Sequence, residues 1–489
     1  MTPALAWVLA AAVAAPAASA PPRKARTAVS LRTRVERALA RVQQQEGLKH
    51  ALWAVDVRSL ASGKPVYSRQ ADLSLMPASS MKLATTAAAL DAFGPDARFS
   101  TTVQTAVRPN TLGLLPGDVY LVGSGDPSLS RELAAHPDYG VFDVLAQSLY
   151  DFGVRRIDGN VVGVDGAFVG ERRGADWSWE DLVWWYGAEV SALTFADGAA
   201  NLKMIPGTSA GEPITIERHP PSAYYKVESR AVTCAPADAP GLTLARRFGR
   251  NVVELGGCLP PSSPAVERWL AMEDPALYAT TVFAEALAAH GIAVGGGVAI
   301  APVVPEGLST LAAYAGEPMA EILKDVNKLS HNLRAEMLLR LLGVRAKGEG
   351  SAAAGREAVL AFLQAQAIDT GGWDVQDGSG LSRSDLVTAR GMVDVLVAMD
   401  KHPHAAAFRD SLPVAGVDGT LKRRLSGPKT RERIRAKTGT LRHTSALAGY
   451  FTPERGEPLA FAIIVNHATA TPAATLDAVD AVAEAIVGS

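Results

Sequence analysis

A serine and a lysine three residues apart, at the start of a predicted helix, constrain this chain more than any other feature. The pair is Ser79 and Lys82, and the Ala- and Leu-rich segment that continues to about Leu90 predicts a helix, with Pro77 near its start. A spacing of three residues puts the hydroxyl and the amine on one helix face, one turn apart. A lysine whose pKa is lowered by burial or by a second cation can take the proton of a hydroxyl. The pair therefore predicts a serine nucleophile beside a lysine base, although this spacing alone is a weak signal.

A second polar motif, Ser330-His331-Asn332, directly precedes a strongly helical run. Two side chains separated by one residue can point into the same cleft from a turn, where Ser330 could relay a proton and Asn332 could bind a substrate amide. Taken alone, the motif is more typical of a helix N-cap, in which a serine or asparagine accepts from free backbone N–H groups.

A third motif, Lys437-Thr438-Gly439-Thr440, ends a predicted strand. A strand edge beside a cleft can pair with an extended peptide, and Gly439 has no side chain to block that approach. The charge of Lys437 and the hydroxyls of Thr438 and Thr440 suit a substrate carboxylate. The alternative is an edge strand with solvated polar residues.

In this order, on a helix, a turn and a strand, the three motifs are those of the penicillin-recognising serine acyl transferases. Residues 83–329 separate the first two motifs, and a β-lactamase has a much shorter segment there. A long β-rich insertion at this point resembles the D-alanyl-D-alanine carboxypeptidase/endopeptidase family, the low-molecular-mass class C penicillin-binding proteins (peptidase family S13). The segments 123–127, 377–383 and 416–421 support the resemblance, which runs from about residue 31 to the end of the chain.

The resemblance implies an α/β (α+β) transpeptidase/β-lactamase-like domain that is split by a long insertion carrying two nested β-rich domains. The expected parts are a signal peptide at 1–20, a catalytic domain at 31–98 and 310–489, an inserted β-rich domain at 99–190 and 291–309, and a nested second domain at 191–290.

The resemblance also implies a role for each motif residue. Ser79 would attack the penultimate D-alanine carbonyl and form an acyl-enzyme, with Lys82 as general base. Ser330 would pass the proton to the leaving group with the help of Lys437, and Asn332 would hold the substrate amide. The substrate-binding residues of the strand would be Thr438, Gly439 and Thr440, with the two hydroxyls on the terminal carboxylate.

The remaining implications concern the surroundings of these residues. The backbone N–H groups of Ser79 and Thr440 would form the oxyanion hole. Asp377 and Ser379 are candidates to line the site, and His331 is expected to face away from it. Water would hydrolyse the ester, so no metal or cofactor is expected. The substrates would be peptidoglycan peptides ending in D-Ala-D-Ala, and β-lactam antibiotics would be inhibitors.

The start of the chain predicts export. Residues 4–20 are nearly all small or apolar and end in Ala18-Ser19-Ala20, although Pro21 disfavours cleavage there. We therefore expect a periplasmic or secreted protein with no integral membrane segment after signal removal. In an oxidising compartment, Cys234 and Cys258 can form a disulfide; the alternative is two buried free thiols.

Charge and motif content exclude or leave open several other functions. The chain has 48 Lys and Arg against 50 Asp and Glu, which gives no general attraction to nucleic acid. A β-lactamase or esterase of the same superfamily, a non-catalytic cell-wall binding homologue and a Ser-His-Asp hydrolase remain alternatives. The sequence leaves open the choice between carboxypeptidase and endopeptidase activity, and the oligomeric state.

Aromatic residues crowd the segment 177–186, which holds four of the eight tryptophans and Tyr186. This cluster predicts packing between domains, and a glycan-contact surface is the alternative.

Overall fold

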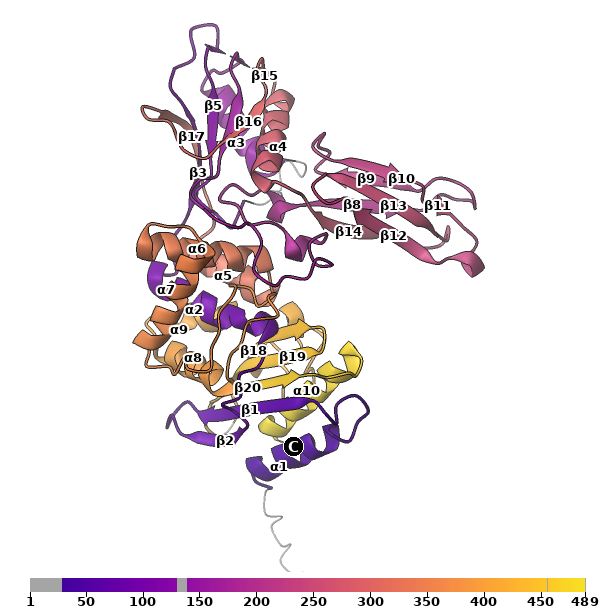
Figure 1. The fold of residues 1–489 in the computed structure, drawn as a ribbon, viewed down its shortest axis with the longest axis vertical. Coiled ribbons are helices and arrows are strands. Elements are labelled where there is room, and N and C mark those ends of the chain that lie inside the picture. Colours follow the sequence, from indigo (N-terminus) through magenta and orange to yellow (C-terminus); the bar gives the residue numbers. More distant parts are fainter. Residues whose placement is uncertain (1–28, 130–138, 455, 489) are drawn as a thin grey trace, which may run out of the picture.

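The computed structural model describes residues 29–129, 139–454 and 456–488. The expected signal peptide, 1–20, lies outside the described residues. Figure 1 shows an elongated molecule: a sheet flanked by helices at the bottom, a helical layer in the middle, and two β-rich parts at the top and to the right. Among the described residues, no helix is both long and apolar enough to cross a membrane.

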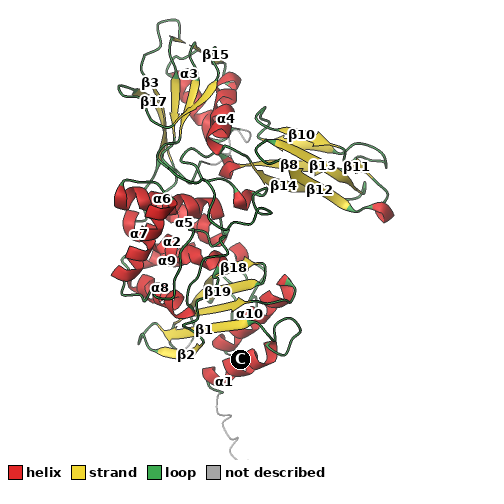
Figure 2. Cartoon of the chain, viewed as in Figure 1, coloured by secondary structure: helices red, strands yellow, loops and turns green. Residues whose placement is uncertain are grey.

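The bottom part is built on a five-stranded antiparallel sheet in the order β18-β19-β20-β1-β2. The strands are β18 (Ile434–Leu441), β19 (Thr444–Phe451), β20 (Leu459–Asn466), β1 (Leu52–Ser59) and β2 (Pro65–Arg69). Every residue of β19 and β20 is buried, because helices cover both faces of the sheet. Helices α1 (Leu31–Val42) and α10 (Pro472–Val487) cover one face, and the helical layer covers the other (Figure 2).

The helical layer surrounds α2, which is apolar on nearly every side and therefore central. Its helices are α2 (Lys82–Phe93), α5 (Met319–Lys328), α6 (Asn332–Lys347), α7 (Ala352–Ala365), α8 (Ala389–Lys401) and α9 (Ala405–Ser411). The sequence pattern is helical over 319–343 around the turn expected at Ser330-His331-Asn332, and the structure divides this region there, between α5 and α6. The division falls where Ser330 has a left-handed φ of 62°, which cannot continue a right-handed helix.

The upper part is a five-stranded sheet in the order β16-β7-β5-β3-β17. Its strands are β16 (Val298–Ala301), β7 (Val161–Val164), β5 (Val119–Val122), β3 (Ser100–Thr105) and β17 (Ser309–Ala315). Two helices pack with it, α3 (Val141–Asp151) and α4 (Pro275–Ala289), and a small sheet joins β15 (Ala293–Val294), β6 (Arg156–Ile157) and β4 (Leu114–Leu115).

Two of the expected boundaries move in the structure. Strand β17 pairs with β3, so residues 310–315 lie in the inserted sheet and not in the catalytic part that was expected to resume at 310. Helix α4 packs on α3, β7 and β16, so 275–289 joins the upper part and leaves the expected nested range of 191–290. The helical pattern predicted over 264–290 is also wrong at its start, where β14 (Val266–Ala271) pairs with another strand.

The part to the right consists of two small sheets, β14-β8-β9 and β10-β13-β11, with β12 paired to β13. Their remaining strands are β8 (Ala199–Ile205), β9 (Thr215–His219), β10 (Lys226–Ser229), β11 (Val232–Thr233), β12 (Gly241–Arg246) and β13 (Val252–Leu259). A disulfide joins Cys234 to Cys258 within this part.

The loop between β8 and β9 contains a Gly-x-Ser-x-Gly match at 207–211, but Ser209 lies on an exposed turn and not at the strand-to-helix elbow of Ser-His-Asp hydrolases.

Candidate active site

Ser79 and Lys82 meet at the junction between a short 3₁₀ turn, η1 (Ala78–Met81), and α2. A 3₁₀ turn has three residues per turn, so side chains three apart are aligned. The Nζ of Lys82 lies 3.0 Å from the Oγ of Ser79, within hydrogen-bond distance. Ser79 itself is half-buried, which leaves its hydroxyl accessible from one side.

The Lys82 amine is fully buried and is held by three oxygen atoms. Besides Ser79 Oγ, it donates to Asn332 Oδ1 at 2.7 Å and to the carbonyl oxygen of Ser379 at 2.6 Å. Burial lowers the pKa of Lys82 to about 7, against the opposing effect of nearby carboxylates. Near neutral pH a large fraction of this amine is therefore unprotonated and can accept a proton.

The loop that supplies the Ser379 carbonyl is built around Asp377. Its Oδ1 accepts from the backbone N–H of Ser379 at 3.0 Å and of Gly380 at 2.6 Å, and its Oδ2 accepts from Ser382 N at 2.7 Å. Asp377 and Ser379 thus lie at the site, where Asp377 shapes the loop and the backbone of Ser379 contacts the base.

Two buried carboxylates that the sequence reasoning missed complete this loop. Glu336 Oε1 accepts from Gly378 N at 3.0 Å and Ser379 N at 2.8 Å. Burial, followed by the charge of Asp377, raises the pKa of Glu336, and the same two causes raise that of Asp385. Glu336 lies one helical turn after Asn332, so the two side chains share a helix face, and this spacing was a signal for it.

The second motif bridges the nucleophile and the strand. Asn332 begins α6, accepts from Lys82 through Oδ1, and donates from Nδ2 to the backbone carbonyl of Tyr186 at 2.9 Å. Ser330 is placed by its left-handed backbone so that its Oγ accepts from Lys437 Nζ at 2.8 Å. Within this motif, Ser330 therefore contacts Lys437 and Asn332 contacts Lys82.

The third motif lies on β18, the edge strand of the five-stranded sheet, packed against η1. Lys437 is fully buried, and burial followed by the charge of Lys82 lowers its pKa well below the ordinary value. Thr438 Oγ1 is 2.8 Å from Thr420 Oγ1, and Thr440 is exposed.

Gly439 has a structural reason to be glycine that differs from the expected one. A Cβ at this position would lie 2.4 Å from the carbonyl oxygen of Pro77, in the turn that carries Ser79. The absent side chain therefore lets the strand approach the nucleophile turn, whereas we expected it to leave room for a substrate.

The aromatic segment forms a contact between the inserted and catalytic parts. Trp177 Nε1 donates to Asp377 Oδ2 at 2.8 Å, and the ring of Trp185 packs edge-on against His331 with centroids 5.1 Å apart. Trp179 is exposed and lies near Phe248. The packing interpretation thus fits Trp177 and Trp185, and His331 turns its buried side chain toward the insertion.

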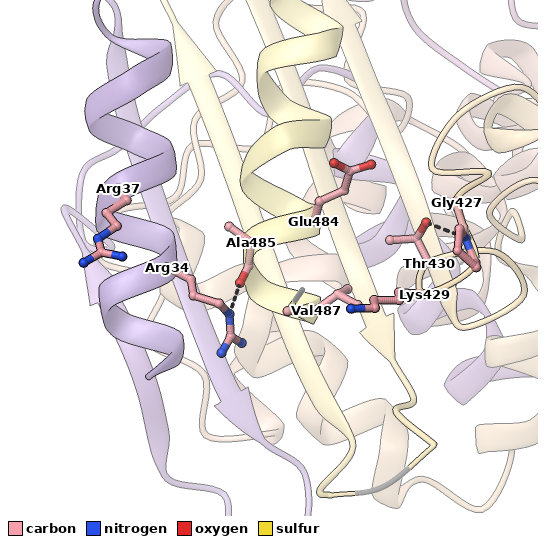
Figure 3. Close-up of a pocket in the computed structure, with 10 residues that line it drawn as sticks. Arg34, Arg37, Gly427, Lys429, Thr430, Glu484, Ala485 and Val487 are labelled. Carbon is pink, nitrogen blue, oxygen red and sulfur yellow. Dashed lines mark hydrogen bonds between the residues drawn. The ribbon is translucent and has the colours of Figure 1, made fainter. Parts of the chain in front are cut away.

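A separate cavity of about 460 Å³ lies between α1, the end of α10 and the loop 427–430 (Figure 3). Arg34 on its wall donates to the carbonyl oxygens of Ala485 at 3.0 Å and Ile486 at 3.2 Å, at the C-terminal end of α10. This arginine therefore fastens two helices together, and none of the three motifs lines the cavity.

Comparisons with known proteins show the family of the chain and its overall fold. The model of the D-Ala-D-Ala carboxypeptidase 3 (S13) family matches residues 35–486. The D-alanyl-D-alanine carboxypeptidase of Actinomadura sp. (strain R39) is 36% identical over 452 residues, which are 90% of this chain and 82% of that protein. The D-alanyl-D-alanine carboxypeptidase DacB of Haemophilus influenzae is 28% identical over 396 residues, 80% of each protein. The crystal structure of penicillin binding protein 4 (dacB) from Haemophilus influenzae superposes with a TM-score of 0.78 at 26% identity and covers 88% of this chain and 94% of that one.

Proposed function

Because the chain belongs to the D-Ala-D-Ala carboxypeptidase 3 (S13) family, we propose that it is a serine-type D-Ala-D-Ala carboxypeptidase that also binds penicillin covalently. The observation that carries this proposal is the buried Lys82 amine 3.0 Å from the Ser79 hydroxyl. A base with a pKa of about 7 is suited to activate a hydroxyl at neutral pH.

Acylation begins with a proton transfer from Ser79 Oγ to the neutral Nζ of Lys82. The oxygen then attacks the carbonyl carbon of the penultimate D-alanine, and the carbonyl oxygen gains negative charge. Backbone N–H groups of Ser79 and Thr440 stabilise this oxyanion, a contribution of about 3 kcal/mol for each such donor. The approach of β18 to η1, which Gly439 permits, supports this placement of the two donors.

The leaving amine receives its proton through Ser330. Lys437 Nζ donates to Ser330 Oγ at 2.8 Å. As the C–N bond breaks, Ser330 gives its hydroxyl proton to the nitrogen of the terminal D-alanine and takes a proton from Lys437 Nζ in return. Hydroxyls of Thr438 and Thr440 bind the terminal carboxylate, and Asn332 orients the substrate amide. Water then attacks the ester carbonyl and gives its proton, through Ser330, to Lys437. Lys82 returns its proton to Ser79 Oγ as the ester bond breaks, which restores the site.

The substrates are peptidoglycan peptides that end in D-Ala-D-Ala, and the same site cleaves a cross-link between two peptides if that bond reaches Ser79. Such substrates lie outside the cytoplasm, so we infer a periplasmic or secreted protein that is exported by the N-terminal segment at 1–20. The disulfide between Cys234 and Cys258 is in keeping with an oxidising compartment.

The intact mass of the protein after incubation with benzylpenicillin tests the proposal, with Ser79→Ala as the matched control. We expect one penicilloyl adduct on the wild type and none on the variant, followed by release of D-alanine from a D-Ala-D-Ala peptide. Rapid turnover of penicillin without an adduct would instead indicate a β-lactamase. Neither adduct nor turnover would indicate a non-catalytic binding protein.

A further inference from the structure

Two consecutive residues of the insertion, Ala196 and Asp197, have left-handed backbones with φ of 50° and 57°. Neither residue is glycine, and each such conformation costs about 1–3 kcal/mol and persists only where the surrounding structure enforces it. They form the short turn η3 (Ala196–Gly198) that leads into β8. Strain of this kind gathers where a side chain must be aimed at a particular target.

The target of Asp197 is the Ser-x-Asn motif. Its Oδ2 lies 3.1 Å from Nε2 of His331, the residue between Ser330 and Asn332, and its Oδ1 accepts from Arg334 Nε at 3.2 Å. The side chains of His331 and Arg334 are only 8% and 9% exposed, so both are largely shielded from water. Asp197 is the carboxylate of the insertion that pairs with them.

Asp197 is ionised in this setting. Burial alone would raise the pKa of Asp197, but His331 and Arg334 outweigh burial and hold the pKa well below its usual range. Arg334 also pairs with Asp325 on α5, so it is fixed from two sides.

The motif needs such external support because it is strained itself. Ser330 has a φ of 62°, and it directly precedes the residue that Asp197 contacts. On the other side, the insertion also accepts from Asn332 through the Tyr186 carbonyl. The insertion therefore contacts the motif at two successive residues, His331 and Asn332.

We propose that Asp197 is a positioning residue for the reaction: from the insertion, its carboxylate fixes the first turn of α6 and thereby the Ser330 and Asn332 side chains at the nucleophile. This inference rests on the proposed function. Displacements of about 1 Å in such groups can lower a rate about a hundredfold without contact with the chemistry.

The experiment compares acylation by benzylpenicillin in full-length wild type, Asp197→Gly and Asp197→Asn. Glycine and asparagine both accept a left-handed backbone more readily than most residues, so the carboxylate is removed without added strain. Asp143→Asn is the matched control, since Asp143 likewise pairs with a histidine, His290, at 2.9 Å, between α3 and α4.

We expect Asp197→Gly to lower the acylation rate constant by about tenfold or more. The non-covalent binding constant and the thermal midpoint of this variant should change little. Asp143→Asn should leave the acylation rate constant unchanged. Asp197→Asn should fall between the two, because an amide can still hydrogen-bond but carries no charge. A loss smaller than about tenfold in Asp197→Gly, or an equal loss in Asp143→Asn, overturns the proposal.

If Asp197→Gly does not fold, His331→Phe removes the same link from the catalytic side, keeps a ring against Trp185, and is judged by the same threshold. The double variant His331→Phe, Asp197→Asn should lose less activation free energy for acylation than the sum of the losses in the two single variants. Strictly additive losses would also contradict the proposal. Absence of an adduct on wild type would refute the proposed function, whereas a normal wild type with unaffected Asp197 variants would refute only this inference.

Discussion

The low pKa of Lys82 leads to a quantitative expectation for the pH dependence of acylation. With its ordinary pKa of 10.5, roughly one amine in 3,000 would be unprotonated at neutral pH, whereas a pKa of about 7 leaves about half of the amines unprotonated. The base must be neutral to accept the Ser79 proton. The acylation rate constant should therefore rise about tenfold per pH unit on the acid side and reach a plateau above a midpoint of about 7.

The Glu336→Gln variant tests the physical cause of this midpoint. The charge of Glu336 raises the pKa of Lys82, so its removal should move the midpoint to lower pH. Glutamine can keep the local geometry, because the single atom Oε1 already accepts both backbone N–H groups of the loop. The shift should stay below about one pH unit, or about 1.4 kcal/mol, because burial raises the pKa of Glu336 and leaves it only partly ionised.

The assay is the second-order rate constant for acylation by a fluorescent penicillin, measured from about pH 5 to about pH 9 on wild type and variant. Stability must be measured at each pH, so that unfolding is not mistaken for titration. A profile that is flat across this range, or a midpoint that moves upward in Glu336→Gln, would refute the assignment of Lys82 as the base.

Two further predictions concern packing and the disulfide. Gly439→Ala should lower the acylation rate about tenfold or more and the free energy of unfolding by about 1–3 kcal/mol. The reason is that the added Cβ would lie 2.4 Å from the Pro77 carbonyl oxygen. Acylation kinetics measure the first effect and denaturant unfolding curves the second. Gly427→Ala, whose nearest neighbour would be 3.5 Å away, is the control, and equal losses in the two variants would contradict the packing argument. Replacing both Cys234 and Cys258 by serine opens a loop of sequence separation 24 and should lower the unfolding free energy by about 3 kcal/mol. The acylation rate should not change. A variant that keeps full stability but loses acylation would contradict this prediction.

The sequence was sufficient to predict the elements that carry the three motifs, because each element has a local signature. The Ala-rich run after Lys82, the helical run after Asn332 and the alternating strand before Gly439 are short-range patterns. Their order along the chain then indicated the fold family, and the structure brings Lys82 and Asn332, 250 residues apart in sequence, to 2.7 Å between Nζ and Oδ1.

The rest of the site depends on contacts that no local pattern encodes. Asp197 and Tyr186 lie in loops of the insertion, and their contacts with α6 exist only because the inserted parts fold back onto the helical layer. The left-handed backbone of Ser330 was equally hidden, because a serine gives no sign of a positive φ. The predicted domain boundaries were wrong for the same reason. Strand β17 belongs to the inserted sheet because it pairs with β3, about 200 residues earlier in the chain, and no local pattern indicates this pairing.

Two buried lysines in one site also divide the acid and base roles of the proposed mechanism. Lys82 and Lys437 are both fully buried, and the charge of Lys82 lowers the pKa of Lys437, so the two amines do not readily hold a proton each. When Lys82 accepts the proton of Ser79, it becomes a cation beside Lys437 and favours loss of any proton from the second amine. In the proposed mechanism, Ser330, which contacts Lys437, passes that proton to the leaving nitrogen. Acid and base roles are thus divided by the coupling between the two amines, without a histidine in either role.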